Sequence, residues 1–123
     1  MHLYQLRVVI KDNKVDEFAK ALMSMLSRFR QEKGCLNYSL YRDIEKVKTY
    51  IVVGEWTTSL AMEKHFKGKG FSVLIGAARV LGQTFEISIN QILEKGDFKL
   101  AREKITIYNQ KKISDTLETS SES

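Results

Sequence analysis

The chain has 123 residues, of which 43% are hydrophobic and 28% are charged, and this balance is typical of one globular domain. Its net charge of +5 arises from 20 lysines and arginines scattered among 15 acidic residues, without the basic face that nucleic-acid-binding proteins present. A single cysteine excludes an intrachain disulfide, and no apolar run reaches the roughly 20 residues of a membrane-spanning helix. Together with an N-terminus unlike a signal peptide, these features predict a cytoplasmic protein that binds neither nucleic acid nor membrane.

The chain begins with a strand and a long helix. Residues 3–10 alternate and then become continuously apolar, which predicts a strand buried on at least one face. Gly34 can adopt the left-handed conformation that ends the following helix. That helix should be amphipathic and about five turns long, because apolar residues recur at spacings of three and four: Val15, Phe18, Ala19, Leu22, Leu26 and Phe29.

A hairpin and two short helices come next. Residues 36–42 and 49–56 are rich in Tyr, Val, Ile and Leu and are joined by a polar loop, which predicts two paired strands. A short helix over 60–66 is interrupted by Gly68-Lys69-Gly70, and residues 84–92 alternate as a last strand. The second helical piece, between them, has one apolar stripe formed by Phe71, Leu74, Ala78 and Leu81.

This order, β-α-β-β-α-β, is that of the ferredoxin-like α+β fold. Two strands interpreted as edges each carry an apolar row, formed by Leu6, Val8 and Ile10 and by Phe85, Ile87 and Ile89. Residues assigned to the other face are also largely apolar, as at Val9, Leu40, Tyr50 and Val53. Because the helices of this fold cover only one face, a sheet that is apolar on both faces needs a second cover. We therefore expect a homodimer with its sheets face to face.

The chain is predicted to divide into a domain over residues 1–95 and a C-terminal extension over residues 96–123. In the extension, Lys104 to Tyr108 alternate like a short strand, which could complete a sheet edge or reach over a partner subunit. Residues 111–123 include a polar segment rich in Ser, Thr and Glu, and they are predicted to be a disordered tail.

Four short motifs resemble the antibiotic biosynthesis monooxygenase family. They are Gly34-Cys35-x-x-Tyr38 after the first helix, Glu55-Trp56 at the end of the third strand, Ala61-Met62-x-x-His65 on the short helix, and Phe71. The resemblance covers roughly residues 3–92. It implies a dimeric α+β barrel whose pocket binds a small aromatic or quinol-like molecule, and relatives perform different reactions in that pocket.

His65 is the candidate catalytic residue. It lies on the short broken helix that borders the pocket in this family, and an imidazole titrating near neutral pH can take a proton from a phenol or enol. The alternative interpretation is a partly exposed histidine that caps its own helix or hydrogen-bonds to it.

Further candidates form the wall of the substrate pocket: Trp56, Tyr41, Arg7, Phe71 and Met62. Trp56 could stack on a flat aromatic substrate, with packing beneath the second helix as the alternative. Phe71 and Met62 would make the pocket apolar, although a helix stripe of this kind is also ordinary core.

Tyr41 or Arg7 is a candidate for steadying a developing oxyanion. Tyr38 and Tyr41 fall on opposite faces of their strand, so at most one of them points toward the helices. Arg7 sits in a mostly apolar strand and needs an acidic partner, for which Glu55 and Glu86 are candidates.

No cofactor and no metal are expected. Gly68-Lys69-Gly70 lacks the strand-to-helix context of a phosphate-binding loop, and two histidines with one cysteine do not make a metal site. In haem-degrading relatives an Asn, a Trp and a His occupy the positions of Gln5, His65 and Ile75, so haem degradation is not expected here. Cys35 is interpreted as a small packing residue, because nothing is placed to activate its thiol.

The resemblance implies a cofactor-independent monooxygenase that oxidises a phenolic or quinol-type molecule with dioxygen. An electron-rich phenolate can itself pass an electron to dioxygen, while the protein supplies a base, a dry cavity and orientation. Two alternatives stay open. One is a non-oxidative isomerase of a small metabolite in the same pocket, and the other is a non-catalytic dimer that binds a small ligand or a partner through its C-terminal extension.

Overall fold

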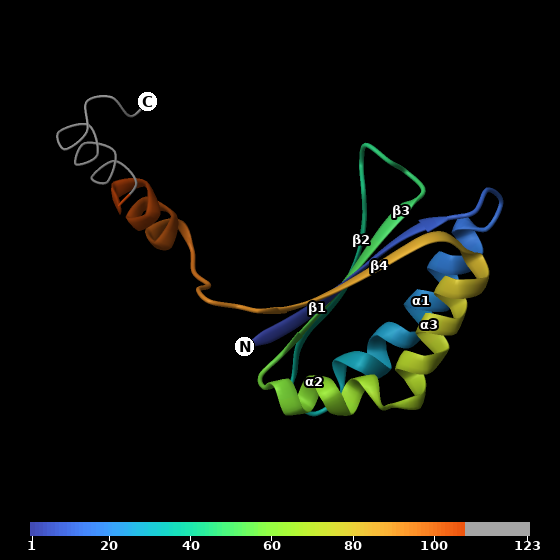
Figure 1. Cartoon of the computed structure of the whole chain (residues 1–123), viewed down its shortest axis with the longest axis horizontal. Helices are drawn as coiled ribbons and strands as arrows, with labels where there is room; N and C mark the ends of the chain where they lie inside the picture. Colours follow the sequence, from blue (N-terminus) through green and yellow to red (C-terminus); the bar gives the residue numbers. More distant parts are fainter. Residues whose placement is uncertain (108–123) are drawn as a thin grey trace, which may run out of the picture. The chain divides into compact units, whose positions relative to one another are not determined.

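The structure, a computed structural model, describes residues 1–107. The chain divides after Ile92 into two units, and each is considered by itself. The elements of the first unit are β1 (His2–Ile10), α1 (Val15–Arg30), β2 (Cys35–Arg42), β3 (Thr49–Trp56), α2 (Ser59–Phe66), α3 (Lys69–Leu81) and β4 (Gly82–Gln91). Figure 1 shows the three helices together on one side of the sheet. The prediction of a ferredoxin-like α+β fold is confirmed.

The sheet has the strand order β2-β3-β1-β4, and every neighbouring pair is antiparallel. The edges are therefore β2 and β4, and the interpretation of β1 as an edge strand is wrong. In β1, every second residue from Tyr4 to Ile10 is buried, so these side chains face the helices. The core cluster that they join contains Phe18, Leu22, Phe29, Tyr38, Val52, Trp56, Met62 and Leu74.

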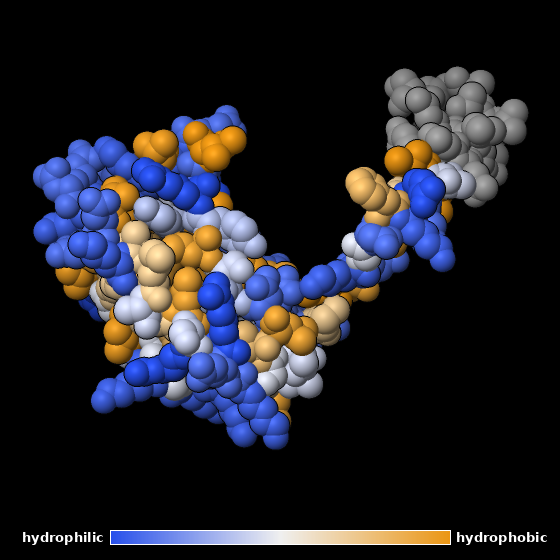
Figure 2. Space-filling model, turned by 180° about the vertical axis from the view of Figure 1, so that it is seen from behind, coloured by the Kyte–Doolittle hydropathy of each residue, from blue (hydrophilic) through white to orange (hydrophobic). Residues whose placement is uncertain are grey.

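The outer face of the sheet, the side away from the helices, has fewer of the expected apolar residues than predicted. Tyr50 lies opposite Val8, and Leu40 lies opposite Val52, so both belong to the helix-covered side because paired residues share a face. Val53 lies opposite Gln5, on the outer face with a polar neighbour. Figure 2, which views the molecule from behind, shows apolar residues in the middle of the first unit within a polar surround.

The turn between α1 and β2 depends on Gly34. The helix ends at Arg30, four residues before the glycine that was predicted to end it. Gly34 has φ +86°, and a Cβ at this position would lie 2.5 Å from the Cβ of Ala61. A glycine is therefore required here both for the left-handed backbone and for the close approach of the turn to α2.

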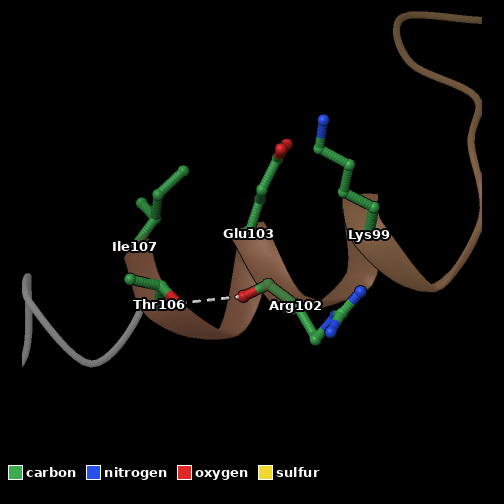
Figure 3. Close-up of a pocket in the computed structure, with 5 residues that line it drawn as sticks. All are labelled: Lys99, Arg102, Glu103, Thr106 and Ile107. Atoms are coloured by element: carbon green, nitrogen blue, oxygen red, sulfur yellow. Dashed lines mark hydrogen bonds between the residues drawn. The ribbon is translucent and has the colours of Figure 1, made fainter.

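The C-terminal unit differs from its prediction, because residues 98–107 are helical where a strand was expected over 104–108. Asp97 supports the start of this helix, since its Oδ1 accepts a hydrogen bond from the backbone N–H of Lys99 at 2.9 Å. Figure 3 shows one surface of the helix, where the hydroxyl of Thr106 donates to the carbonyl of Arg102 at 3.0 Å. Tyr108 and the predicted disordered tail over residues 111–123 lie outside the described residues.

Candidate functional site

The site is centred on His65, which α2 holds between the helices and the sheet. A side-chain cap starts this helix, since the hydroxyl of Thr58 accepts a hydrogen bond from the backbone N–H of Ala61 at 3.1 Å. His65 lies in the last turn of α2 and is only 1% exposed. It is therefore a buried polar residue, which requires hydrogen-bond partners.

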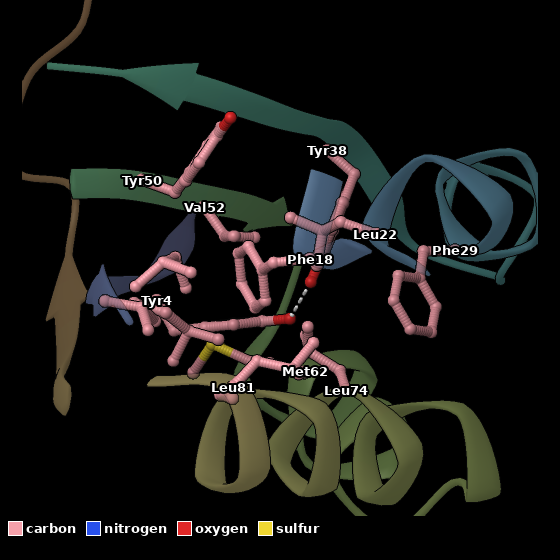
Figure 4. Packing of buried hydrophobic residues seen from close by; sticks show 14 of the residues in the cluster. Tyr4, Phe18, Leu22, Phe29, Tyr38, Tyr50, Val52, Met62, Leu74 and Leu81 are labelled. Carbon is pink, nitrogen blue, oxygen red and sulfur yellow. Dashed lines mark hydrogen bonds between the residues drawn. The ribbon is translucent and has the colours of Figure 1, made fainter. Parts of the chain in front are cut away.

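Both ring nitrogens of His65 have partners. Nδ1 lies 3.0 and 3.1 Å from the two carboxylate oxygens of Glu32, and Nε2 lies 2.7 Å from the hydroxyl of Tyr4. The same Tyr4 hydroxyl lies 2.6 Å from the hydroxyl of Tyr38, and Figure 4 shows the two tyrosines pointing toward each other. Four side chains from four segments thus form one chain of hydrogen bonds, which we call the His65 network: Tyr38, Tyr4, His65 and Glu32.

The direction of the hydrogen bonds follows from the chemistry of the groups. An ionised carboxylate only accepts, so Nδ1–H of His65 donates to Glu32. In the neutral imidazole Nε2 then accepts, so Tyr4 donates to it and in turn accepts from Tyr38. Every proton of the network therefore points toward Glu32, whose side chain is 33% exposed. This carboxylate is the end of the network that reaches solvent.

Burial sets the protonation states of the network. It lowers the pKa of His65 below its ordinary value, and the Glu32 carboxylate opposes part of that change. Burial also raises the pKa values of Tyr4 and Tyr38. At neutral pH the imidazole is therefore neutral and able to accept a proton, whereas both phenols keep theirs.

Aromatic rings enclose the imidazole of His65. Tyr4 stacks on it with ring centroids 5.4 Å apart and planes at 25°, and Trp56 lies at 4.5 Å and 33°. Phe29 and Phe71 contact it at 4.9 and 5.4 Å. The result is a low-dielectric surround in which charge–charge interactions are stronger than in water.

Trp56 is fully buried, and within residues 1–107 its Nε1–H has no hydrogen-bond partner. An unsatisfied buried donor of this kind costs about 1–3 kcal/mol, and such groups in folded proteins call for an explanation. A ligand oxygen is one acceptor that would satisfy it. The indole ring lies 4.5 Å from the imidazole of His65, measured between centroids, so the unsatisfied donor and the candidate base belong to one cluster of rings.

The structure brings together some of the candidates and separates others. Trp56, Met62 and Phe71 lie with His65 on the helix-covered side, where Met62 is 2% exposed. Tyr41 lies on the outer face and is 51% exposed. The alternation rule correctly separates Tyr38 from Tyr41, and Tyr38 is the one that points toward the helices.

Arg7 on β1 and Tyr41 on β2 both pair with Ile51 on β3, the strand between them. Arg7 therefore lies on the outer face, on the same side of the sheet as Tyr41. Glu55 and Glu86 are the predicted partners of Arg7, whereas its Nη2 forms an ion pair at 3.1 Å with Asp43 in the β2–β3 loop. Two backbone N–H groups and this guanidinium lower the pKa of Asp43. Within one chain, neither Arg7 nor Tyr41 can reach a molecule held beside His65.

Sequence reasoning missed Tyr4, Glu32 and Phe29 as site residues. Tyr4 has a detectable signal, because it precedes Leu6 by two positions and so shares the core-facing side of its strand. Glu32 lies in the turn after α1 and carries no periodic signal, so only the folded chain places it beside His65.

Two further findings concern the described residues alone. Within residues 1–107, no three His, Cys, Asp or Glu side chains gather as a metal ion would require. No helix in the same range is long and apolar enough to cross a bilayer. The cytoplasmic location stays a prediction.

Sequence comparison places the chain among known proteins. The family model described as antibiotic biosynthesis monooxygenase matches residues 1–75. The uncharacterized Synechocystis protein sll1783 is 26% identical over 88 residues, which cover 71% of this chain and 60% of that protein, so the match spans less than two-thirds of that relative. YcnE of Bacillus subtilis, a candidate monooxygenase, is 24% identical over 81 residues, covering 66% of this chain and 85% of YcnE.

Solved structures agree on the fold. A candidate antibiotic biosynthesis monooxygenase from Deinococcus radiodurans superposes with a TM-score of 0.73 at 20% identity, covering 79% of this chain and 97% of that one. A variant of SnoaB, a cofactor-independent oxygenase from Streptomyces nogalater, superposes with a TM-score of 0.68 at 20% identity, covering 76% and 94%. The family model matches more than half of the sequence and the fold agrees with it, so this chain belongs to the antibiotic biosynthesis monooxygenase family.

Proposed function

We propose that the protein is a cofactor-independent monooxygenase that oxidises a phenolic or quinol-type small molecule with dioxygen. The observation that carries this proposal is the pairing of a neutral, buried His65 with the carboxylate of Glu32 on one side and the hydroxyl of Tyr4 on the other. A base in this position can receive a proton and hold the new charge beside a carboxylate.

In the proposed mechanism Tyr4 relays the substrate proton. Nε2 of His65 is already occupied by Tyr4, so the substrate hydroxyl takes the place of Tyr38 as the donor to Tyr4. Tyr4 passes its own proton to His65 and receives the substrate proton in return. Its raised pKa suits a relay, because the phenol stays protonated before and after the transfer. The imidazolium that forms is stabilised by Glu32.

The phenolate produced in this way supplies the electrons. It transfers one electron to dioxygen, and recombination of the two radicals forms a carbon–oxygen bond and a ring hydroperoxide. Cleavage of the O–O bond, with protons returned through the network, leaves a quinone and one water. One oxygen atom enters the product and the other leaves as water, so the substrate is the only reductant. The N–H of Trp56 is the candidate donor to the oxygen that becomes negative, and Phe71 and Met62 wall the ring.

Oxygen uptake by the purified protein, without added metal or flavin, tests the proposal against a panel of hydroquinones and polyphenols. We expect saturable uptake with formation of a quinone. His65→Gln should lower the rate at least about 100-fold, as is usual for loss of a general base. Tyr4→Phe should lower it about tenfold, whereas Tyr41→Phe, on the other face of the sheet, should retain it. An undiminished rate in folded His65→Gln would refute the role of the imidazole.

Oxygen consumption also separates this proposal from the isomerase alternative. An isomerase would use the same base but would convert its substrate into a product of equal mass without consuming dioxygen. Turnover that depends on His65 and leaves the oxygen concentration unchanged would favour that reaction.

A homodimer is the proposed assembly. Phe85, Ile87 and Ile89 lie on the helix-covered side of β4 yet are 43%, 41% and 59% exposed. Within the described residues, β4 pairs with β1 alone, and an apolar edge strand of this kind is usually covered. Light scattering should give twice the chain mass of 14.2 kDa, and a monomer at micromolar concentration would contradict the proposal.

A further inference from the structure

A groove between α1 and α3 lies next to the His65 network. It has a volume of about 200 Å³, and its lining residues come from one turn of each helix: Met25, Arg28 and Phe29 from α1, and Lys69, Gly70 and Val73 from α3. An apolar cavity of about 150 Å³ is enough to hold benzene. The α1–α3 groove therefore matches one aromatic ring with small substituents.

One side chain, Phe29, separates this groove from the network. Its ring lines the groove and is 1% exposed. On its inner side the same ring lies 4.9 Å from the imidazole of His65 and 4.9 Å from the ring of Tyr38, measured between centroids. A substrate ring that displaced Phe29 would occupy its place, within reach of Tyr4 and His65.

Gly70 makes the space that this ring occupies. A Cβ at position 70 would lie 2.6 Å from Cε1 of Phe29, a distance that real contacts do not allow. The absence of a side chain here keeps α3 close to α1 and leaves the phenyl ring between them. The ring of Phe29, held beside Gly70, thus links the groove with the surround of His65.

The rim of the groove is positively charged. Arg28 and Lys69, one from each helix, are exposed, and within residues 1–107 neither forms a salt bridge. Between them the lining is apolar, with Met25, Val73 and the ring of Phe29. Two cations beside an apolar slot are complementary to a flat molecule that carries a negative group at one end.

We propose that the α1–α3 groove admits a phenol that bears a carboxylate, held by Arg28 and Lys69 while its ring displaces Phe29. The hydroxyl end then reaches Tyr4 and His65. This inference rests on the proposed function, in which Tyr4 and His65 take the proton of the substrate hydroxyl. It adds a substrate class and an entry point that the proposed function does not require.

Binding in the absence of oxygen tests the inference separately from turnover. Trp56 is the only tryptophan of the chain and lies beside His65, so its fluorescence reports on the site, with calorimetry as a second measurement. The probes are hydroquinone and gentisate, which differ by one carboxylate. We expect gentisate to bind about tenfold more tightly, equivalent to about 1.4 kcal/mol, and the preference should weaken as salt is added.

Charge variants identify the cause of the preference. Combined Arg28→Gln and Lys69→Gln should bring gentisate to the affinity of hydroquinone and leave hydroquinone unchanged. Lys20→Gln, an exposed position elsewhere on α1, is the control for loss of charge. Gly70→Ala should weaken both probes, because its Cβ would enter the space that the substrate ring takes from Phe29.

Three results would overturn the inference: equal affinity for the two probes, a preference that survives in the double variant, or no binding of either probe. Preferential binding of gentisate that the double variant abolishes would support it even if oxygen uptake were absent. That result would refute the proposed oxidation but support the proposed binding site.

Discussion

The interaction between Glu32 and His65 offers a sharp test of the site. The hydrogen bonds from Nδ1 to the carboxylate measure 3.0 and 3.1 Å, and a hydrogen bond to a charged group contributes about 1.5–3 kcal/mol. Because the side chain of Glu32 is 33% exposed, solvent screens the charge and the lower value applies. Glu32→Gln should therefore remove about 1.5 kcal/mol from the stabilisation of the imidazolium, which is roughly a tenfold loss in kcat/KM.

The pH profile distinguishes this effect from a structural one. Glu32 raises the pKa of His65 against the effect of burial, so its removal should lower that pKa further. The acid limb of kcat/KM reports the free-enzyme base and should therefore move to lower pH in Glu32→Gln, while the plateau falls. Glu63→Gln, an exposed position on α2, is the matched control and should change neither.

NMR titration gives the same information without turnover. The chain has two histidines, so the signals of His65 can be assigned by comparison with His65→Gln. We expect the His65 titration to move to lower pH in Glu32→Gln. An unchanged titration together with an unchanged pH profile would refute the proposed role of the carboxylate.

Two further predictions concern stability. Burial lowers the pKa of His65 in the folded state below the ordinary value of about 6.5. Just below pH 6.5 the unfolded chain therefore binds more protons than the folded chain, so the free energy of unfolding should fall as the pH drops through this range. Urea denaturation at several pH values should show a shallower dependence on pH for His65→Gln than for the unchanged protein. Equal slopes would contradict a buried neutral imidazole. Gly70→Ala should lower the free energy of unfolding by about 1–3 kcal/mol through overpacking. Gly76→Ala is the control on the same helix, because a Cβ there meets nothing within 4 Å; it should raise the free energy of unfolding by about 0.4–1 kcal/mol. Thermal melts of the two variants measure both effects. Equal effects would show that the contact at position 70 carries no strain.

Local patterns predicted most of the fold. The apolar spacing from Val15 to Phe29 identified α1, and the alternation from Phe85 to Ile89 identified β4. The same kind of pattern failed at Lys104 to Tyr108, where five alternating residues suggested a strand but the described part, to residue 107, is helical. A run that short fits both periods, so it does not distinguish a strand from a helix.

The site was predictable only in part. The motif residues His65, Trp56 and Phe71 meet in one cluster. The sequence could show that Tyr38 and Tyr41 face opposite ways but not which face the helices cover, because that depends on strand pairing. Tyr41 is the predicted pocket residue, whereas the structure places Tyr38 on the helix-covered side and Tyr41 on the outer face.

The sequence by itself determined the order of strands and helices in residues 1–92, the family and the place of His65 on a short helix, because periodicity and short motifs are properties of neighbouring residues. Only the tertiary structure decided what His65 touches. Its network joins residues 34, 61 and 33 positions apart, and the ion pair of Arg7 spans 36. Such contacts depend on how the strands pair and how closely helices approach the sheet, and no local pattern records either.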